Sequence, residues 1–246
     1  MRKLLYVPVI HVDSDLGSMA SSIEKRSVQI CGRERWERHK QTVSIFWDNI
    51  EKYFNKVNAD NLKIYQDGLM ADGELGQKII KEGAQKGSRN YQIVLDLVRK
   101  SAEIRKTEDV ALLKEEYNRI IKLSQSKSIW ERTVAYIGYR FHRDKLMEKR
   151  DRFIADNINH TLKEGETGVL FIGAYHNVFA HIAKDITIEE VKKREKVKAY
   201  FKMLISGRDK ERFDELAEYL VKSEQWVVDS DQRIEDSNEQ RETSNQ

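Results

Sequence analysis

Apolar residues recur along this chain in two patterns, as short continuous runs and as long stripes with helical spacing. Four short runs are typical of buried strands because they are rich in β-branched and aromatic residues: Leu4–Val9, 61–69, 102–109 and Val169–Ile172. The third run is the weakest. Strands that alternate with helices indicate a helix-rich α/β fold with a mainly parallel sheet of at least four short strands.

The helical stripes cover most of the remaining chain. Between Met19 and Phe54 they predict two helices that break at Gly32. Further helices are predicted at Glu74–Lys86, Asn90–Lys100, Thr107 (as the N-cap) to Leu123, Trp130–Leu162 with an interruption near Gly138, Val178–Ala183, Glu189–Leu204 and Lys210–Lys222.

Pro8 is the only proline in the sequence, so the long helices can run uninterrupted. It falls inside the first predicted strand and cannot donate a hydrogen bond to a neighbouring strand. We therefore expect Pro8 near the end of that strand or on an unpaired side.

Composition narrows the class of protein. The 44 Lys and Arg residues nearly balance the 41 Asp and Glu residues, so no nucleic-acid partner is indicated. No segment approaches the roughly 20 apolar residues of a membrane span, and Cys31 is the only cysteine, which favours a reducing compartment. We expect a cytoplasmic protein with one domain over 1–228, a disordered polar tail over 229–246, and the option of homo-oligomers.

Polar residues follow each predicted strand. His11 follows the first strand, Asp67 the second, Glu108 the third and His176 the fourth. Ligands bind outside the carboxyl ends of the strands in open α/β sheets, so we expect these residues to converge. Imidazoles with carboxylates suit a divalent metal such as Mn, Co or Zn, or general acid–base chemistry. A structural hydrogen bond is the commoner role for any one such histidine.

Two further residues complete the candidate site. Gly173, at the end of the fourth strand, would leave room for the turn and for a ligand. Arg150 lies on the helix that leads into this strand and would stabilise an oxyanion, unless it belongs to a solvated charged face. The sequence contains no P-loop, G-x-G-x-x-G, CxxC, HExxH or G-x-S-x-G motif.

The stretch RDRFIADNINHTLKEGETGVLFIGAYHNV resembles the C-terminal signature of the TraB/PrgY–Tiki–GumN family, within a superfamily that includes erythromycin esterases and ChaN-type haem-binding proteins. The resemblance covers residues 148–177. Gly173 to His176 matches the G-x-x-H motif, and Arg150-Asp151 matches the preceding helix. Pro8 stands where the family has a glycine in its first motif, and Asp67 where the family usually has a glutamate.

The resemblance implies metal-dependent peptide hydrolysis or histidine-based ester hydrolysis, with haem binding and peptide sequestration also within the family's range. The leading hypothesis is a hydrolase that acts on a small molecule or peptide. His11, His176 and Asp67 would be metal ligands or acid and base, Arg150 the oxyanion clamp, and Glu108 a further member. One alternative is a non-catalytic module that binds a peptide, nucleotide or haem, and another is a structural protein that assembles through its helices.

Overall fold

The computed structural model describes residues 1–12, 15, 20–115, 118 and 129–222, and for 129–143 it describes the backbone alone. Its described strands form one parallel sheet in the order β3–β2–β4–β1–β5. The strands are β1 (Arg2–Val9), β2 (Leu62–Gln66), β3 (Glu103–Arg105), β4 (Thr167–Gly173) and β5 (Ile186–Glu190). The predicted helix-rich α/β fold with a parallel sheet is confirmed.

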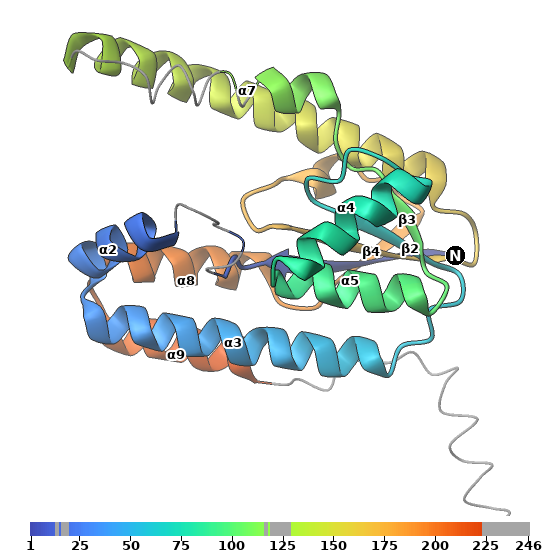
Figure 1. Ribbon diagram of the computed structural model, residues 1–246, viewed down its shortest axis with the longest axis horizontal. Coiled ribbons are helices and arrows are strands. Elements are labelled where there is room, and N and C mark those ends of the chain that lie inside the picture. Colours follow the sequence, from blue (N-terminus) through green and yellow to red (C-terminus); the bar gives the residue numbers. More distant parts are fainter. Residues whose placement is uncertain (13–14, 16–19, 116–117, 119–128, 223–246) are drawn as a thin grey trace, which may run out of the picture.

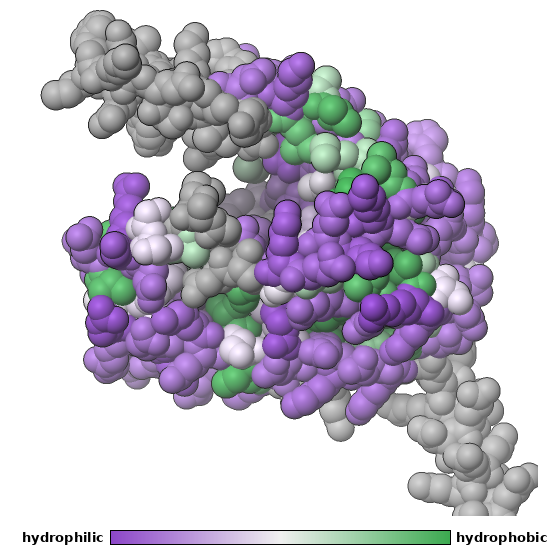
Figure 2. All heavy atoms as spheres, in the orientation of Figure 1, coloured by the Kyte–Doolittle hydropathy of each residue, from purple (hydrophilic) through white to green (hydrophobic). Residues whose placement is uncertain are grey.

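The helices bury both faces of this sheet (Figure 1). On one face, Tyr6 and Leu170 pack with Ile154 and Ile158 from the long helix α7 (Ile129–Thr161). The opposite face packs on α3 (Arg33–Asn55), α4 (Gly73–Gln85), α5 (Arg89–Arg99), α8 (Arg194–Ser206) and α9 (Lys210–Val221). Side chains alternate between the faces along each strand, so both faces of the central strands carry apolar residues. On the face of the molecule that Figure 2 shows, most side chains are hydrophilic and smaller hydrophobic areas lie between them.

Several predicted helix boundaries agree closely with the structure. Gly32 has φ 83°, a left-handed backbone that separates α2 (Ala20–Cys31) from α3. The expected helices over 74–86, 90–100 and 210–222 correspond to α4, α5 and α9. For these three helices, the periodic spacing of apolar residues predicted the ends to within one residue.

Four helix predictions were wrong in part. The α7 backbone is helical through Gly138 without a break. Thr107 is not the N-cap of the helix after β3, because Asp109 Oδ1 accepts from Ala111 N at 2.7 Å and the helical residues begin at 110. The helix expected from Val178 is a single 3-10 turn, η2 (Val178–His181). The end predicted at Leu123 lies outside the described residues.

The fourth error concerns the segment expected to be helical from Glu189 onward. Residues Ile186–Glu190 instead form β5, and α8 begins only at Arg194. β5 pairs with β1 alone, so it is an edge strand with one partner. Its partly exposed polar residues concealed the strand pattern, because only one of its five residues is buried.

Pro8 occupies the position that its chemistry requires. β5 pairs with β1 only from Arg2 to Tyr6, whereas β4 continues alongside β1 to Val9. At Pro8 the β5 side of the strand is therefore unpaired, and the missing N–H disrupts no ladder hydrogen bond. This prediction is confirmed.

The described residues also bear on the predictions for membrane spans and for the C-terminal tail. In the described part of the chain, no helix has the length and apolarity needed to cross a membrane. The tail predicted over 229–246 lies outside the described residues, so the domain limits at 1–228 and the disorder of the tail remain predictions.

Candidate functional site

The carboxyl ends of three adjacent strands bring most of the predicted site residues together. Asp67 follows β2, Glu108 lies beyond β3, and His176 follows β4, which is the neighbour of β2 in the sheet. Backbone hydrogen bonds connect these segments. Leu69 O accepts from Glu108 N at 3.1 Å, and Phe171 O of β4 accepts from Asp67 N at 2.9 Å. The convergence expected at this edge is present for these three residues.

His176 is held by a carboxylate from α7. Its Nδ1 lies 2.6 Å from Asp151 Oδ1, and Asp151 Oδ2 accepts from Asn177 N at 2.7 Å. Because an ionised carboxylate only accepts hydrogen bonds, Nδ1 carries a proton, and in the neutral ring Nε2 is the nitrogen without one. Asp151 and His176 are both buried. A buried carboxylate therefore fixes both the tautomer and the orientation of the imidazole.

The electrostatic environment favours the protonated form of His176. Burial alone would lower its pKa, but the hydrogen bond to Asp151 and the negative charges of Asp67 and Asp151 outweigh burial and raise it. The Nε2 atom lies 3.8 Å from Asp67 Oδ2. The imidazole thus stands between two carboxylates, one that orients it and one that faces its reactive nitrogen.

Arg150 connects the remaining carboxylates. Its guanidinium donates to Glu108 through Nε at 3.1 Å and through Nη2 at 2.5 Å, and Nη2 also reaches Asp67 Oδ1 at 3.2 Å. The Glu108 side chain is fully buried, and its pKa is raised by that burial although Arg150 opposes the rise. The predicted clamp is therefore already bonded to two carboxylates, and Asp67 lies between Arg150 and His176.

His11 is exposed and pairs with Asp15 rather than with this polar cluster. Its side chain is 64% exposed, and its Nδ1 is 3.6 Å from Asp15 Oδ2, whose carboxylate raises the pKa of His11. In the described part of the chain, no hydrogen bond or ion pair joins His11 to His176. Both histidines nevertheless relate to Asp67, because His11 and Asp67 line one pocket of about 460 Å³.

The backbone conformation and the packing at Gly173 do not require a glycine. Gly173 has no left-handed backbone conformation, and a Cβ built on it would meet only His176 Cδ2, at an ordinary 3.7 Å. A side chain at this position would therefore be tolerated by its neighbours. Whether a ligand approaches the backbone there remains a prediction.

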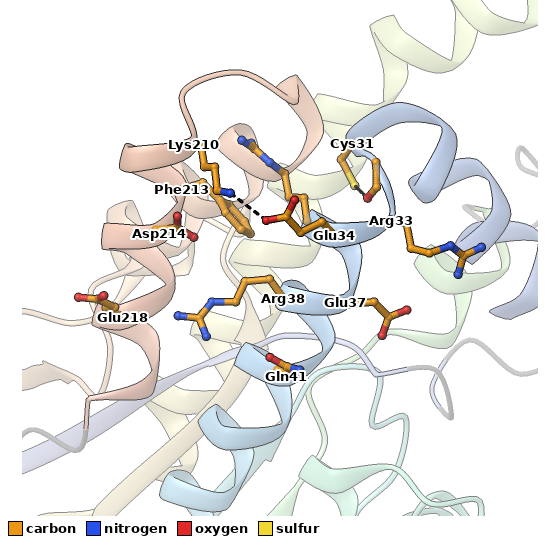
Figure 3. Close-up of a pocket in the computed structure, with 12 residues that line it drawn as sticks. Cys31, Arg33, Glu34, Glu37, Arg38, Gln41, Lys210, Phe213, Asp214 and Glu218 are labelled. Carbon is orange, nitrogen blue, oxygen red and sulfur yellow. Dashed lines mark hydrogen bonds and ion pairs between the residues drawn. The ribbon is translucent and has the colours of Figure 1, made fainter.

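A larger pocket of about 780 Å³ lies elsewhere, between the first turns of α3 and the helix α9 (Figure 3). Its lining is charged on both sides, and Lys210 on α9 pairs with Glu34 on α3 at 2.8 Å. Cys31 lies at its margin, and burial raises the pKa of this thiol, which makes it a poor nucleophile. This pocket contains none of the predicted site residues.

The donor atoms offer an incomplete set for a divalent metal. His176 Nε2 and Asp67 Oδ2 face each other. Asp67 is also bonded to the cationic Arg150, and His11 pairs with Asp15 instead of with these two residues. No group of three or more His, Cys, Asp or Glu residues suited to a metal occurs among the described residues. Structural and catalytic sites usually have at least three protein ligands, so these residues by themselves do not fit a resident ion.

Asp151 is not among the predicted site residues, although its neighbour Arg150 is. The available signal was the Arg-Asp pair on the helix before β4, within the stretch that carried the family resemblance. On a helix, adjacent residues point about 100° apart, so Arg150 and Asp151 reach different partners, Asp67 with Glu108 and His176 respectively. Only the packing of α7 against β4 made the second contact visible.

No family model, no curated protein and no solved structure matches this chain. The resemblance over 148–177 therefore stays a prediction.

Proposed function

We propose that this protein is a hydrolase of peptide or ester bonds in which His176 acts as the general base. The observation that carries the proposal is the buried Asp151–His176 pair at the carboxyl edge of the sheet, with Nε2 turned toward Asp67. A carboxylate that holds the Nδ1 proton and stabilises the imidazolium is the arrangement that general-base histidines use.

The chemistry follows from the order of these groups. A water molecule bonded to His176 Nε2 and Asp67 would attack the carbonyl carbon while its proton moves to Nε2. The imidazolium would then give that proton to the leaving oxygen or nitrogen as the carbon–heteroatom bond breaks. Asp151 would stabilise the imidazolium, and Arg150 would hold Asp67 in position. Each step conserves protons without a further reactant.

The non-catalytic alternative is supported by one feature of the site. Arg150 is already bonded to Asp67 and Glu108, so less of its charge is available to a developing oxyanion. A binding module would keep this ion-pair network for rigidity and would use the adjacent pocket for its ligand.

Hydrolysis assays of the purified protein test the proposal. We expect turnover of p-nitrophenyl butyrate or of alanine p-nitroanilide, and we expect His176→Ala to lower kcat/KM at least about 100-fold because it removes the general base. His160→Ala is the matched control, since His160 is an exposed histidine of α7 outside the cluster. Full activity in His176→Ala would refute the mechanism, and a folded wild type inert toward both ester and amide would favour the binding module.

The same preparations test the metal prediction by elemental analysis. Near-stoichiometric Mn, Co or Zn that is lost in both His176→Ala and His11→Ala would establish one shared metal site. Retention in His11→Ala would remove His11 from the ligands.

A further inference from the structure

The pocket beside Asp67 is built largely from parts that the hydrolytic mechanism does not use. Its walls come from the end of β2, from α4, from the start of α5 and from the segment after β1. Its volume of about 460 Å³ is within the range of sites for small ligands. Gln66, Ser88 and Asn90 line it and are themselves buried. The pocket therefore has an interior of ordered polar side chains.

Gln66 has an unused acceptor in this lining. Only 2% of the residue is exposed, and its Nε2 donates to Asp67 O at 3.2 Å. Its Oε1 accepts no hydrogen bond in the described part of the chain. A buried amide oxygen without a donor is destabilising, and a donor supplied by a ligand would remove that cost.

The charged groups of the lining favour a cation. Three carboxylates contribute to it, against Lys86, which is the exposed C-cap residue of α4, and His11. Asp15 accepts from Val12 N and faces His11, whereas Glu82 has no ion-pair partner among the described residues. The half-buried ring of Tyr91 also lines the pocket, and aromatic faces attract cations.

From the unpartnered Gln66 oxygen and the carboxylate-rich wall, we propose that this pocket binds a primary ammonium group. Such a group has three N–H donors and a positive charge, so it can bond to Gln66 Oε1 while the carboxylates neutralise it. The ammonium belongs either to a small aliphatic amine or to the amino terminus of a peptide.

The position of Asp67 connects this pocket to hydrolysis. Asp67 lines the pocket and also lies 3.8 Å from His176 Nε2. This part of the inference rests on the proposed function: an ammonium held in the pocket places the following carbonyl of the same molecule beside Asp67 and His176. Binding of the ammonium itself does not depend on catalysis.

Calorimetric titration with four probes tests the inference on the full-length protein. n-Butylammonium represents a small amine, and amidated trialanine represents a peptide amino terminus whose only charge is the ammonium. n-Butanol and N-acetylated, amidated trialanine are their uncharged counterparts. We expect at least one charged probe to bind about tenfold more tightly than its counterpart. The probe that binds identifies the source, and equal binding of charged and neutral members in both pairs overturns the inference.

Two substitutions connect binding to the named residues. Gln66→Met keeps the length of the side chain and removes the acceptor, so affinity should fall about tenfold. Glu82→Gln should lower affinity about threefold through the lost charge, and Glu74→Gln is its matched control because Glu74 is an exposed residue of α4 outside the lining. If Gln66→Met does not fold, the comparison of Glu82→Gln with Glu74→Gln still tests whether the pocket binds the ammonium probe. Unchanged affinity in every folded pocket variant contradicts the inference.

The outcomes for binding and for hydrolysis are separable. His176→Ala should still bind the ammonium probe, since His176 is not part of the lining. Probe binding without any hydrolysis in the wild type would refute the proposed hydrolase and leave the ammonium site standing. Hydrolysis without probe binding would refute the ammonium site and leave the proposed hydrolase standing.

Discussion

At the scale of single residues, Asp151 sets the orientation of His176, although it was not among the predicted site residues. It is a buried carboxylate whose two oxygens are both engaged, one by His176 Nδ1 and the other by Asn177 N. His176 owes to this contact its tautomer and part of its raised pKa. The orientation of the His176 imidazole is thus set by a residue outside the lining of the pocket beside Asp67.

This arrangement predicts a specific pH dependence. As a general base, His176 must be neutral, so kcat/KM should rise with pH through the raised pKa of His176, above its ordinary 6.5. Asp151→Asn removes the charge that raises this pKa, so the midpoint of the profile should move to lower pH while the rate falls about 100-fold. The measurement is a pH–rate profile of both proteins on one substrate. Loss of rate with an unmoved midpoint would indicate a merely structural role.

At the scale of elements, the pocket beside Asp67 depends on how closely α4 packs against β3. Gly76 of α4 is buried, and a Cβ built on it would collide with the carbonyl oxygen of Ala71 and lie 2.8 Å from Ile104 Cδ1. The helix can approach the sheet this closely only because residue 76 has no side chain. The same helix supplies one wall of the pocket beside Asp67.

Gly76→Ala should therefore destabilise the fold. We expect the free energy of unfolding to fall by about 1–3 kcal/mol, the usual cost of overpacking a well-packed interior. Gln77→Ala, at the adjacent exposed position of α4, should change it by less than about 0.5 kcal/mol. Urea denaturation of the two variants beside the wild type makes the comparison. Equal stability of all three proteins would show that α4 shifts freely.

At the scale of the whole molecule, a buried histidine makes the stability of the fold depend on pH. His39 of α3 is only 6% exposed, its Nδ1 lies 2.9 Å from Tyr200 OH of α8, and its ring packs on Trp36. Burial lowers the pKa of His39 to about 4. The folded protein therefore keeps this imidazole neutral at a pH where the unfolded chain would already protonate it.

Acidification should therefore lower the stability of the fold through His39. The stabilisation from neutral His39 is fully present above the ordinary pKa of 6.5 and is lost as pH falls from there toward about 4. This contribution falls by about 1.4 kcal/mol per pH unit over that window. His39→Gln keeps a hydrogen-bonding partner for Tyr200 but does not titrate. Denaturation at pH 7 and pH 5 should show a smaller loss in the variant, and equal losses would contradict the assignment.

The hydrophobic pattern by itself determined the fold class, the first four strands and most helix boundaries, because these depend on local periodicity. It also placed Asp67, Glu108 and His176 at one edge, since parallel strands bring their carboxyl ends together. Only the tertiary structure decided the rest. The pairing of Asp151 with His176 spans 25 residues and depends on how α7 packs on β4, and β5 became a strand because β1 offered it an edge. The exposed position of His11 was likewise decided by chain packing, which no local pattern encodes.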